Sequence, residues 1–293
     1  MKITLLPKAK CKLRSFILLT LSLMYTPAFA TSPLFLPSPI GHQDSLETAT
    51  WNIEHFPKHS KTVSHLSSYL KAMDVDFWAF QEVASETEYF KLVNNMPGYE
   101  AVLSDHEYSD GSYQKTAFLY KTDIFQPTDS YLIFTNNRYE FPRPALVVEG
   151  TVRMSSGEEL EMMAITVHLK AFMNSKSRRR RSAAMHKMLE FLDNVSSMYP
   201  NKLLVLMGDF NEFYDQDSVF GEFKDHGYEF ETKQLFATGK ASYVNKRRSL
   251  IDHIITSPNY HFERSVIPEL HLDDHFYLRE VSDHLPVISV LEM

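Results

Sequence analysis

Two apolar segments joined by a very short turn constrain the fold most. The first is ALVVEGTVRM (145–154), the second is LEMMAITVHL (160–169), and SSGE lies between them. Both segments predict β-strands, and a connection this short joins neighbouring strands as a hairpin. Elsewhere, too, strand patterns follow one another directly, with helical patterns between some of them. This order favours an α/β fold of sheets packed on one another with helices outside, rather than a doubly wound parallel sheet.

The spacing of apolar residues assigns the other elements. Further strands are predicted at ETATWNI (47–53), VDFWAFQEV (75–83), KTAFLYK (115–121), KLLVLMGDF (202–210), SLIDHIITS (249–257) and HLPVISVLEM (284–293). Helices are predicted at HSKTVSHLSSYLKAM (59–73), SETEYFKLVNNM (85–96) and SRRRRSAAMHKMLEFLDNVSSM (177–198). No repeat or internal linker interrupts the pattern, so a single large domain is expected.

Residues 1–30 predict a secretory signal peptide. A basic opening without an acidic residue precedes the apolar run SFILLTLSLMY, which is too short to span a bilayer, and AFA follows it. The mature chain is expected to begin at Thr31, which N-terminal sequencing of exported protein would test. Residues 31–46 contain three prolines without any period and predict a tail or linker. The folded domain is expected over 47–293.

The cysteine content and the net charge indicate the cellular compartment of the mature chain and limit how it can bind polyanions. The one cysteine, Cys11, lies in the predicted signal peptide, so no disulfide framework is expected. Export without disulfides fits a bacterial periplasm or the medium. Removing residues 1–30 takes away five positive charges and changes the formal charge from −7 to about −12. Such a chain needs local basic residues or a bound cation to act on a polyanion.

Polar side chains recur where predicted strands end. The sequences WNIEHF, FQEV, VHLK, GDFN, IDHI and SDHLPV contain Asn52, Glu54, Glu82, His168, Asp209, Asn211, Asp252, His253, Asp283 and His284. Strand ends that meet at one rim of a sheet are common places for functional sites. Carboxylates, amides and histidines without cysteine favour Mg²⁺ or Mn²⁺, with Ca²⁺ as an alternative, over structural zinc. No nucleophile elbow, cysteine nucleophile or phosphate-binding glycine loop is present, which leaves a cation, an activated water and histidine–carboxylate pairs.

These motifs, in this order and spacing, resemble the endonuclease/exonuclease/phosphatase family, which includes DNase I, AP endonucleases and sphingomyelinases. The resemblance implies a four-layer α/β sandwich, with two mostly antiparallel sheets face to face and helices on both outsides. It also implies a role for each matching residue. Metal ligation falls to Glu82, with Asn52 and Asp283 beside it, and catalysis to His168, Asp209, Asn211, Asp252 and His284. Asp209 and Asn211 would orient water and phosphoryl oxygens, and Asp252 would hold His284.

Several residues have two interpretations. Glu54 is an outer metal ligand or a solvent-facing carboxylate. Arg143, in FPRPAL, faces the scissile phosphate or holds a surface turn, and Lys170 is a similar candidate for phosphate binding. The run Arg178–Arg181 starts a helix, and a solvated helix face is expected for it. His253 follows Asp252 along a strand, points to the opposite face and is expected to be structural.

The resemblance indicates the type of bond that is cleaved, a phosphoester, more clearly than it indicates the substrate. The first hypothesis is a metal-dependent nuclease with contacts mainly to the nucleic-acid backbone, because HLKA and the arginine-rich helix resemble secreted bacterial nucleases. The second is a sphingomyelinase-like phospholipid phosphodiesterase, for which YEFPRP (139–144) and HFYLRE (275–280) are candidate membrane-entering segments. The third is a non-catalytic secreted binding protein. A monomer without stable membrane association is expected.

Overall fold

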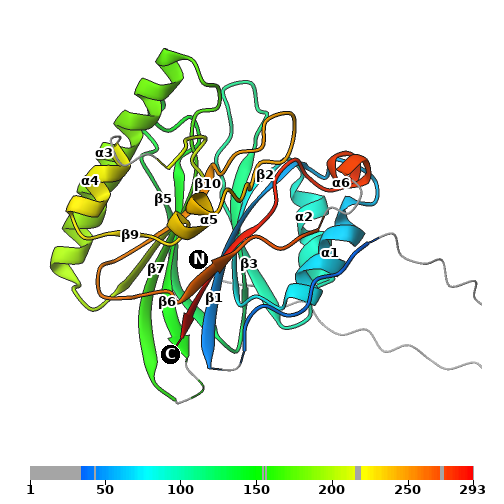
Figure 1. Ribbon diagram of the computed structural model, residues 1–293, viewed down its shortest axis with the longest axis horizontal. Coiled ribbons are helices and arrows are strands. Elements are labelled where there is room, and N and C mark those ends of the chain that lie inside the picture. The colour runs from blue at the N-terminus through cyan, green and yellow to red at the C-terminus, as the bar shows by residue number, and fades with distance from the viewer. Residues whose placement is uncertain are drawn as a thin grey trace, which may run out of the picture. The chain divides into compact units, whose positions relative to one another are not determined.

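The computed structural model describes residues 34–42, 44–153, 155, 157–214, 219–270 and 274–292 (Figure 1). The predicted signal peptide lies outside these residues. Residues 34–42 have no regular secondary structure, but the amide of Ile40 donates to the carbonyl of Met73 at 3.1 Å. The first strand begins at Ser45, two residues before the predicted start of the domain. No helix in the described part of the chain is long and apolar enough to cross a bilayer.

Two six-stranded sheets form the centre of the fold. The first contains β1 (Ser45–Phe56), β2 (Phe77–Val83), β3 (Tyr99–Leu103), β4 (Lys115–Lys121), β11 (Arg264–Val266) and β12 (Val287–Glu292). The second contains β5 (Phe125–Ile133), β6 (Ala145–Arg153), β7 (Glu159–His168), β8 (Leu203–Asp209), β9 (Glu229–Phe230) and β10 (Asp252–Thr256). Their strand orders are β11-β12-β1-β2-β4-β3 and β5-β6-β7-β8-β10-β9. The predicted hairpin is the antiparallel β6–β7 pair.

Among the described residues, each sheet has one parallel strand pair, and its other pairs are antiparallel. In the first sheet β1 runs parallel to β2, and in the second sheet β7 runs parallel to β8. Parallel neighbours need a crossover, and helices supply it in both cases. α1 (Thr62–Met73) connects β1 to β2, and α3 (Ser175–Met198) connects β7 to β8.

Helices cover the outer face of each sheet. α1 and α2 (Glu86–Asn94) pack on the first sheet with α6 (Asp274–Glu280), and α3 and α4 (Val219–Asp225) pack on the second (Figure 1). The short α5 (Lys233–Ala237) contributes Leu235 to the core between the two sheets. The inner faces pack on each other through residues such as Phe77, Phe118 and Met162. The predicted four-layer α/β sandwich is confirmed, and Trp51 and Trp78 are fully buried in its core.

The two-residue period of the strands decides which side chains lie between the sheets. On β8, Leu204 and Leu206 face α3, whereas Val205 and Met207 face the other sheet. Side chains two positions apart on a strand point to the same face. Asp209, two positions after Met207 on β8, and Asp252, two positions before Ile254 on β10, therefore also point inward. His253 has the opposite parity and contacts the rings of Phe210, Phe220 and Phe230 on the α4 side. The predicted outward direction of His253 is therefore confirmed.

A buried carboxyl on β1 makes stability depend on pH. The side chain of Glu47 is 2% exposed, contacts the Ser45 hydroxyl and lies beside Asp76, which is paired with Lys121 at 2.9 Å. Burial raises the pKa of Glu47 from 4.5 to about 8, and the neighbouring Asp76 carboxylate adds to the increase. The folded state therefore keeps a proton that the unfolded chain releases between these pH values, and stability falls as pH rises through this window.

Glu47→Gln is expected to remove this dependence, because glutamine keeps the shape and cannot ionise. At pH 8.5 the variant should be more stable than wild type by a few kcal/mol, because each unit by which the folded pKa exceeds the unfolded pKa costs about 1.4 kcal/mol at high pH. Each kcal/mol corresponds to roughly 2–4 °C in Tm for a domain of this size. At pH 5 the two proteins should melt together. Thermal unfolding across this range measures the difference. A constant difference at all pH values would contradict the titration of Glu47.

Candidate functional site

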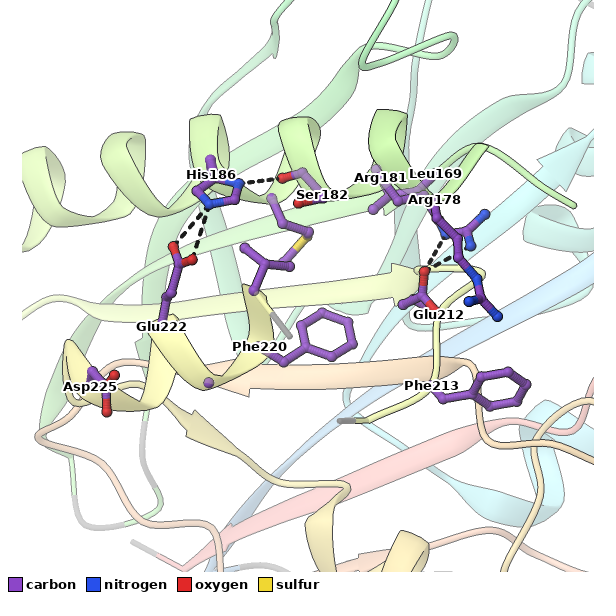
Figure 2. A pocket seen from close by; sticks show the side chains of 13 residues that line it. Leu169, Arg178, Arg181, Ser182, His186, Glu212, Phe213, Phe220, Glu222 and Asp225 are labelled. Carbon is purple, nitrogen blue, oxygen red and sulfur yellow. Dashed lines mark hydrogen bonds and ion pairs between the residues drawn. The ribbon is translucent and has the colours of Figure 1, made fainter. Parts of the chain in front are cut away.

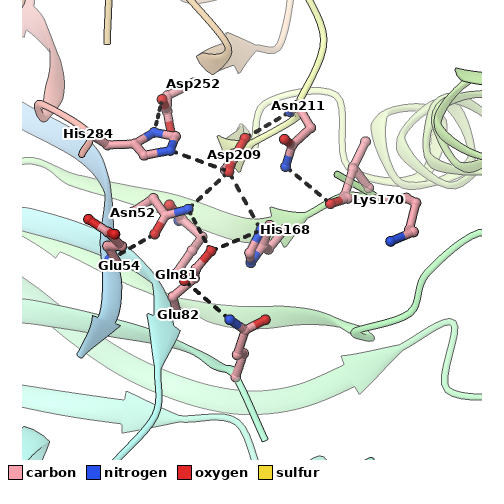
Figure 3. Close-up of polar contacts among 12 residues, drawn as sticks. Asn52, Glu54, Gln81, Glu82, His168, Lys170, Asp209, Asn211, Asp252 and His284 are labelled. Atoms are coloured by element: carbon pink, nitrogen blue, oxygen red, sulfur yellow. Dashed lines mark hydrogen bonds and ion pairs between the residues drawn. The ribbon is translucent and has the colours of Figure 1, made fainter. Parts of the chain in front are cut away.

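The candidate site lies where the two parallel strand pairs end. Asn52 ends the regular part of β1 and Glu82 lies near the end of β2, while His168 and Asp209 are the last residues of β7 and β8. His168 and Asp209 are direct register partners, and Asp209 is also opposite Asp252 on β10. Because parallel strands end at the same edge, each pair delivers two polar side chains to the rim, and the face-to-face sheets bring the sets together (Figure 3).

Irregular backbone at these strand ends turns the side chains toward one another. The β1–β2 and β2–β4 registers both shift beside the site. Glu54, Glu82 and Asn211 adopt positive φ angles of 38°, 66° and 53°. Each such conformation costs a non-glycine residue on the order of 1 kcal/mol, and residues of this kind are concentrated at functional sites.

Gly208 allows β7 and β8 to approach closely beside the site. Its φ is +149°, and a Cβ there would lie 2.0 Å from the carbonyl oxygen of Val167. Any side chain at this position would therefore push the two strands apart. With glycine, the Nε2 of His168 lies 3.5 Å from the carboxylate of Asp209.

His284 is held by a short charged hydrogen bond across the two sheets. It lies just before β12 in the first sheet, and its Nδ1 is 2.7 Å from Oδ2 of Asp252 in the second. Its backbone is fixed as well, because its amide donates to the Ser282 hydroxyl and its carbonyl accepts from Trp51 Nε1. The predicted cross-strand pair of Asp252 and His284 is present.

The surrounding carboxylates keep His284 protonated. Burial alone would lower its pKa, but Asp252, followed by Asp209 and Asp283, raises the pKa of His284 to about 10. Its Nε2 faces the carboxylates of Asp209 at 3.9 Å and Asp283 at 3.8 Å. His284 is therefore a cation near neutral pH and can donate a proton from Nε2.

His168 has the opposite character. It is buried, and burial lowers the pKa of His168 well below its usual range, with the positive charge of Arg143 adding to the effect. The imidazole is therefore neutral. Its Nε2 faces Asp209 and Glu82, and its Nδ1 has no hydrogen-bond partner within the described residues.

Asp209 is the centre of the hydrogen-bond network. One oxygen accepts from the backbone amide of Asn211 at 2.8 Å, and the other accepts from Asn52 Nδ2 at 3.0 Å. Burial raises the pKa of Asp209 to about 7, with the Asp252 carboxylate adding and His284 opposing the increase. A carboxylate with a pKa near 7 is suited to take a proton from a nearby water.

Glu82 accepts hydrogen bonds from three sides. Its Oε2 accepts from the backbone amide of His55 at 3.0 Å and from Gln114 Nε2 at 3.2 Å, and its Oε1 accepts from Asn52 Nδ2 at 3.3 Å. This network fixes the orientation of the carboxylate. Asn52 lies between Glu82 and Asp209, so these three residues form a connected set of oxygen-bearing side chains (Figure 3).

Asp283 lies on the other flank of the site, beside Glu54. Burial raises the pKa of Glu54, Lys58 opposes this increase, and the Asp283 carboxylate adds to it. Within the described part of the chain, no hydrogen bond or ion pair joins Asp283 to Asn52 or Glu82. The structure therefore brings Asn52 and Glu82 of the predicted metal set into contact, and it places Asp283 with Glu54 and His284.

The donor set fits a hard divalent cation. Two buried or nearly buried carboxylates, Glu82 and Asp209, flank the amide of Asn52, and oxygen ligands of this type suit Mg²⁺ or Mn²⁺. The Asn52 amide currently donates through its nitrogen, and a rotation of the amide would present its oxygen instead. Asp209, Asp252 and His284 also lie within 4.8 Å of one another, but Nδ1 of His284 is engaged by Asp252.

Both predicted phosphate-binding cations lie at the site. Arg143 donates to Gln114 Oε1 at 2.8 Å and to the carbonyl of His168 at 3.2 Å, and its buried Nε has no partner among the described residues. The Lys170 ammonium lies 4.6 Å from the centroid of the Phe172 ring. Both cations therefore border the strand end that carries His168.

The arginine run differs from its predicted role as a solvated helix face. Arg178 and Arg179 are exposed, but Arg181 is 1% exposed and forms an ion pair with Glu212 at 2.7 Å. The loop that follows β7 lies over Arg181 and provides carbonyl acceptors for it. The expectation of a wholly solvated run is therefore wrong at its last residue.

Sequence reasoning missed three residues that contact the site. Gln114 links Glu82 to Arg143, and Ser282 accepts from the His284 amide while donating to the carbonyl of Asn52. The ring of Tyr243 packs edge-on against His284 with centroids 5.2 Å apart. Of the three, only Ser282 could have been found from the sequence, because it immediately precedes the Asp-His motif. Gln114 and Tyr243 lie in segments without any motif.

A cavity of about 620 Å³ lies next to the site, between α3 and α4 (Figure 2). Arg178, Arg181, Glu212, Phe213 and Phe220 contribute to its wall, and His186 bridges to Glu222 at its far side. Asp209, Asp252 and Glu82 are not part of its lining. The polar chemistry is therefore outside this cavity.

The fold and the paired imidazole–carboxylate centre define a class of phosphoester hydrolases. The model of the endonuclease/exonuclease/phosphatase family matches residues 49–284, and the chain belongs to this family. Members of the family are phosphoesterases, including nucleases, and they generally depend on divalent metal ions. The search of curated proteins found no match.

Solved structures show the same fold. An endonuclease/exonuclease/phosphatase family protein from Bacteroides thetaiotaomicron is 18% identical with a TM-score of 0.63, covering 84% of this chain and 94% of that one. TDP2 from D. rerio, complexed with a single-strand DNA product, is 18% identical with a TM-score of 0.62, covering 85% and 99%. A mannosyl-6-phosphatase from B. thetaiotaomicron is 17% identical with a TM-score of 0.61, covering 83% and 98%.

Proposed function

We propose that this chain is an exported, metal-dependent phosphodiesterase that hydrolyses nucleic acid, with Mg²⁺ or Mn²⁺ as its cation. One observation carries the chemistry: a protonated imidazole, His284, and a neutral one, His168, both face the carboxylate of Asp209. Two groups of the same type in opposite charge states serve different steps of one hydrolysis. A binding protein has no use for this difference.

The cation would be held by Glu82 and Asn52, with Asp209 adjacent. Bound there, it would neutralise charge on a non-bridging phosphate oxygen and so favour attack on phosphorus. Asp209, fixed by the Asn211 amide, orients the attacking water and takes its proton. His284 stabilises the growing negative charge by donating from Nε2, and Asp252 keeps it oriented and protonated.

A polyanionic substrate fits the charge distribution around the site. The mature chain is acidic overall, yet Lys170, Arg178 and Arg179 lie on the loop and helix that follow His168, and Arg143, just before β6, donates to the carbonyl of His168. Such a local basic surface attracts a phosphate backbone despite the net charge. The bound single-strand DNA product in the TDP2 complex supports the same substrate class.

The two candidate membrane-entering segments support the phospholipid hypothesis less than the basic residues support the nuclease hypothesis. HFYLRE lies within helix α6, and Tyr277 in it is fully buried, with its hydroxyl donating to the carbonyl of His284. In YEFPRP, Phe141 is buried and stacks on Phe134. Tyr139 of YEFPRP is exposed, but its ring centroid lies 5.1 Å from the Arg180 guanidinium carbon, so this segment offers a single charge-paired ring rather than the broad apolar surface that membrane entry requires.

The substrate assay offers residues 31–293 plasmid DNA, RNA, sphingomyelin vesicles, mannose 6-phosphate and a small chromogenic phosphodiester, each with Mg²⁺. We expect cleavage of nucleic acid that weakens as salt rises. Arg178→Glu with Arg179→Glu should lower DNA cleavage by roughly tenfold at low salt, since local charge steers the substrate. Hydrolysis of the small diester should stay unchanged.

Lys71→Glu with Lys91→Glu is the matched control. It makes the same charge change on α1 and α2, in the opposite outer layer, and should leave DNA cleavage near the wild-type rate. Equal losses in both double variants would show that only net charge matters. Hydrolysis of vesicles or of mannose 6-phosphate with intact nucleic acid would overturn the proposed substrate.

A further inference from the structure

The loop after β7 displays a strained, exposed aromatic residue four positions beyond His168. The Phe172 side chain is 68% exposed, and the residue has a φ of +80°. A bulky residue in this conformation is a genuine backbone outlier, and it also leaves a large apolar surface in water. Strain of this kind persists where the surrounding structure enforces it, and it points to a function of the exposed group.

Arg181 enforces the conformation of this loop. Its Nη1 donates to the carbonyl of Lys170 at 2.7 Å and to the carbonyl of Phe172 at 2.8 Å. Its Nε and Nη2 contact a single oxygen of Glu212 at 2.9 and 2.7 Å. A buried guanidinium that engages two carbonyls and a carboxylate is well compensated for its loss of water. The exposure of Phe172 is therefore built into the fold.

The same contacts tie this loop to the catalytic rim. Glu212 directly follows Asn211, and the Asn211 side chain donates to the carbonyl of Leu169 at 3.3 Å. Phe213, which is 37% exposed, follows Glu212 on the second loop (Figure 2). The loop after β7 and the loop after β8 thus each carry an exposed phenylalanine.

One cation lies against the Phe172 ring, and two exposed arginines follow on the helix that continues this loop. The Lys170 ammonium lies 4.6 Å from the centroid of the ring, and Arg178 and Arg179 are exposed in the first turns of α3. Aromatic faces next to cations bind single-stranded nucleic acid, because bases stack on the rings while the cations contact phosphates. A neutral or zwitterionic lipid surface would not need this concentration of cations.

We propose that Phe172 is a stacking platform for an unpaired nucleobase next to the phosphodiester that the site cleaves, with Lys170 on an adjoining phosphate. This inference rests on the proposed nuclease function. Its occupant is single-stranded nucleic acid or an unpaired end, since a base inside a duplex is already stacked on both faces. The platform reads no base edge, so it favours single strands without selecting a sequence.

A substrate cycle tests the platform. Wild type and Phe172→Ala are compared on a dinucleotide and on analogues in which one base is replaced by hydrogen. We expect the variant to lose roughly tenfold in kcat/KM on the complete dinucleotide, from the usual strength of base–aromatic stacking. On the analogue that lacks the stacked base, wild type and variant should be equal. Phe90→Ala, which removes a 47% exposed ring on α2, is the matched control and should change neither rate.

A binding measurement gives a readout without turnover. The only tryptophans of the chain, Trp51 and Trp78, are fully buried, so Phe172→Trp adds an exposed fluorophore. With EDTA present, a short single-stranded oligonucleotide should quench this fluorescence, and a chain of abasic residues should not. The tryptophan variant should also prefer the complete dinucleotide over the base-deleted analogue, as wild type does, because it preserves the stacking surface.

Two results would overturn the platform and leave the nuclease proposal intact. The first is that Phe172→Ala loses kcat/KM equally on the complete and the base-deleted substrates. The second is that the oligonucleotide does not quench the tryptophan of Phe172→Trp while wild type still cleaves single strands. A different result overturns both proposals: wild type inactive on nucleic acid, sphingomyelin vesicles hydrolysed, and that activity lost in Phe172→Ala.

Discussion

His284→Ala and Asp252→Ala are each expected to lower kcat on nucleic acid by about 10²-fold or more, the usual range for an acid–base group. His284 is the protonated imidazole that faces Asp209, and Asp252 holds it through a 2.7 Å hydrogen bond. Removing either one leaves the other without its function. The double variant should therefore lose far less than the product of the single losses.

The pH profile separates orientation from charge. In Asp252→Asn the hydrogen bond can remain, but the negative charge that raises the pKa of His284 is gone. Activity that needs protonated His284 should then fall at a lower pH than in wild type. His226→Ala is the matched control, since His226 Nδ1 contacts Asp193 with the same 2.7 Å geometry at the surface. Strictly multiplicative losses at His284 and Asp252 would contradict their action as a pair.

Removing the cation, or its main carboxylate, is expected to have an effect of similar size. EDTA should abolish activity, and Mg²⁺ or Mn²⁺ should restore it. Glu82→Gln keeps the shape but replaces one oxygen by a donor that faces other donors, the His55 amide and Gln114. The lost ligand charge should cost about 10²-fold or more in turnover, because a bound cation contributes several kcal/mol of charge stabilisation.

Cation affinity provides the second readout for Glu82. Mg²⁺ should raise the Tm of wild type, because it relieves repulsion among buried carboxylates, and it should raise the Tm of Glu82→Gln much less. Glu100→Gln, an exposed change on β3, should behave as wild type in both measurements. Full activity in EDTA, or an unchanged Mg²⁺ response in Glu82→Gln, would contradict a metal role for this carboxylate.

The sequence predicted the parts of the site that depend on strand period and order. The two-residue alternation is enough to place Asp252 inward and His253 outward, because a buried strand fixes which face each residue takes. The hairpin at β6–β7 and the order of strands and helices favoured packed sheets with helices outside, and the family resemblance implied the four-layer sandwich. The edge strands β3, β5, β9 and β11 were missed, since they are very short or largely exposed and have no clear apolar alternation.

Contacts across distant loops were beyond the sequence for a different reason. Four consecutive arginines are chemically identical, and helical spacing shows which of them share a face but not which loop lies over it. Arg181 is buried because the β7–α3 loop closes on it. Gln114 likewise gains its role from tertiary contacts with Glu82 and Arg143 alone.

The path of the chain between the sheets also sets when a newly made molecule can become active. The chain builds most of the first sheet, then the whole second sheet, and returns at its end to place β12 beside β1. The contact between Ser282 and Asn52 spans 230 positions. Closing so long a loop comes late in folding, because its entropy is lost before the contacts form. A growing chain therefore lacks His284 until its last segment has been made, so the proposed hydrolysis requires the complete first sheet.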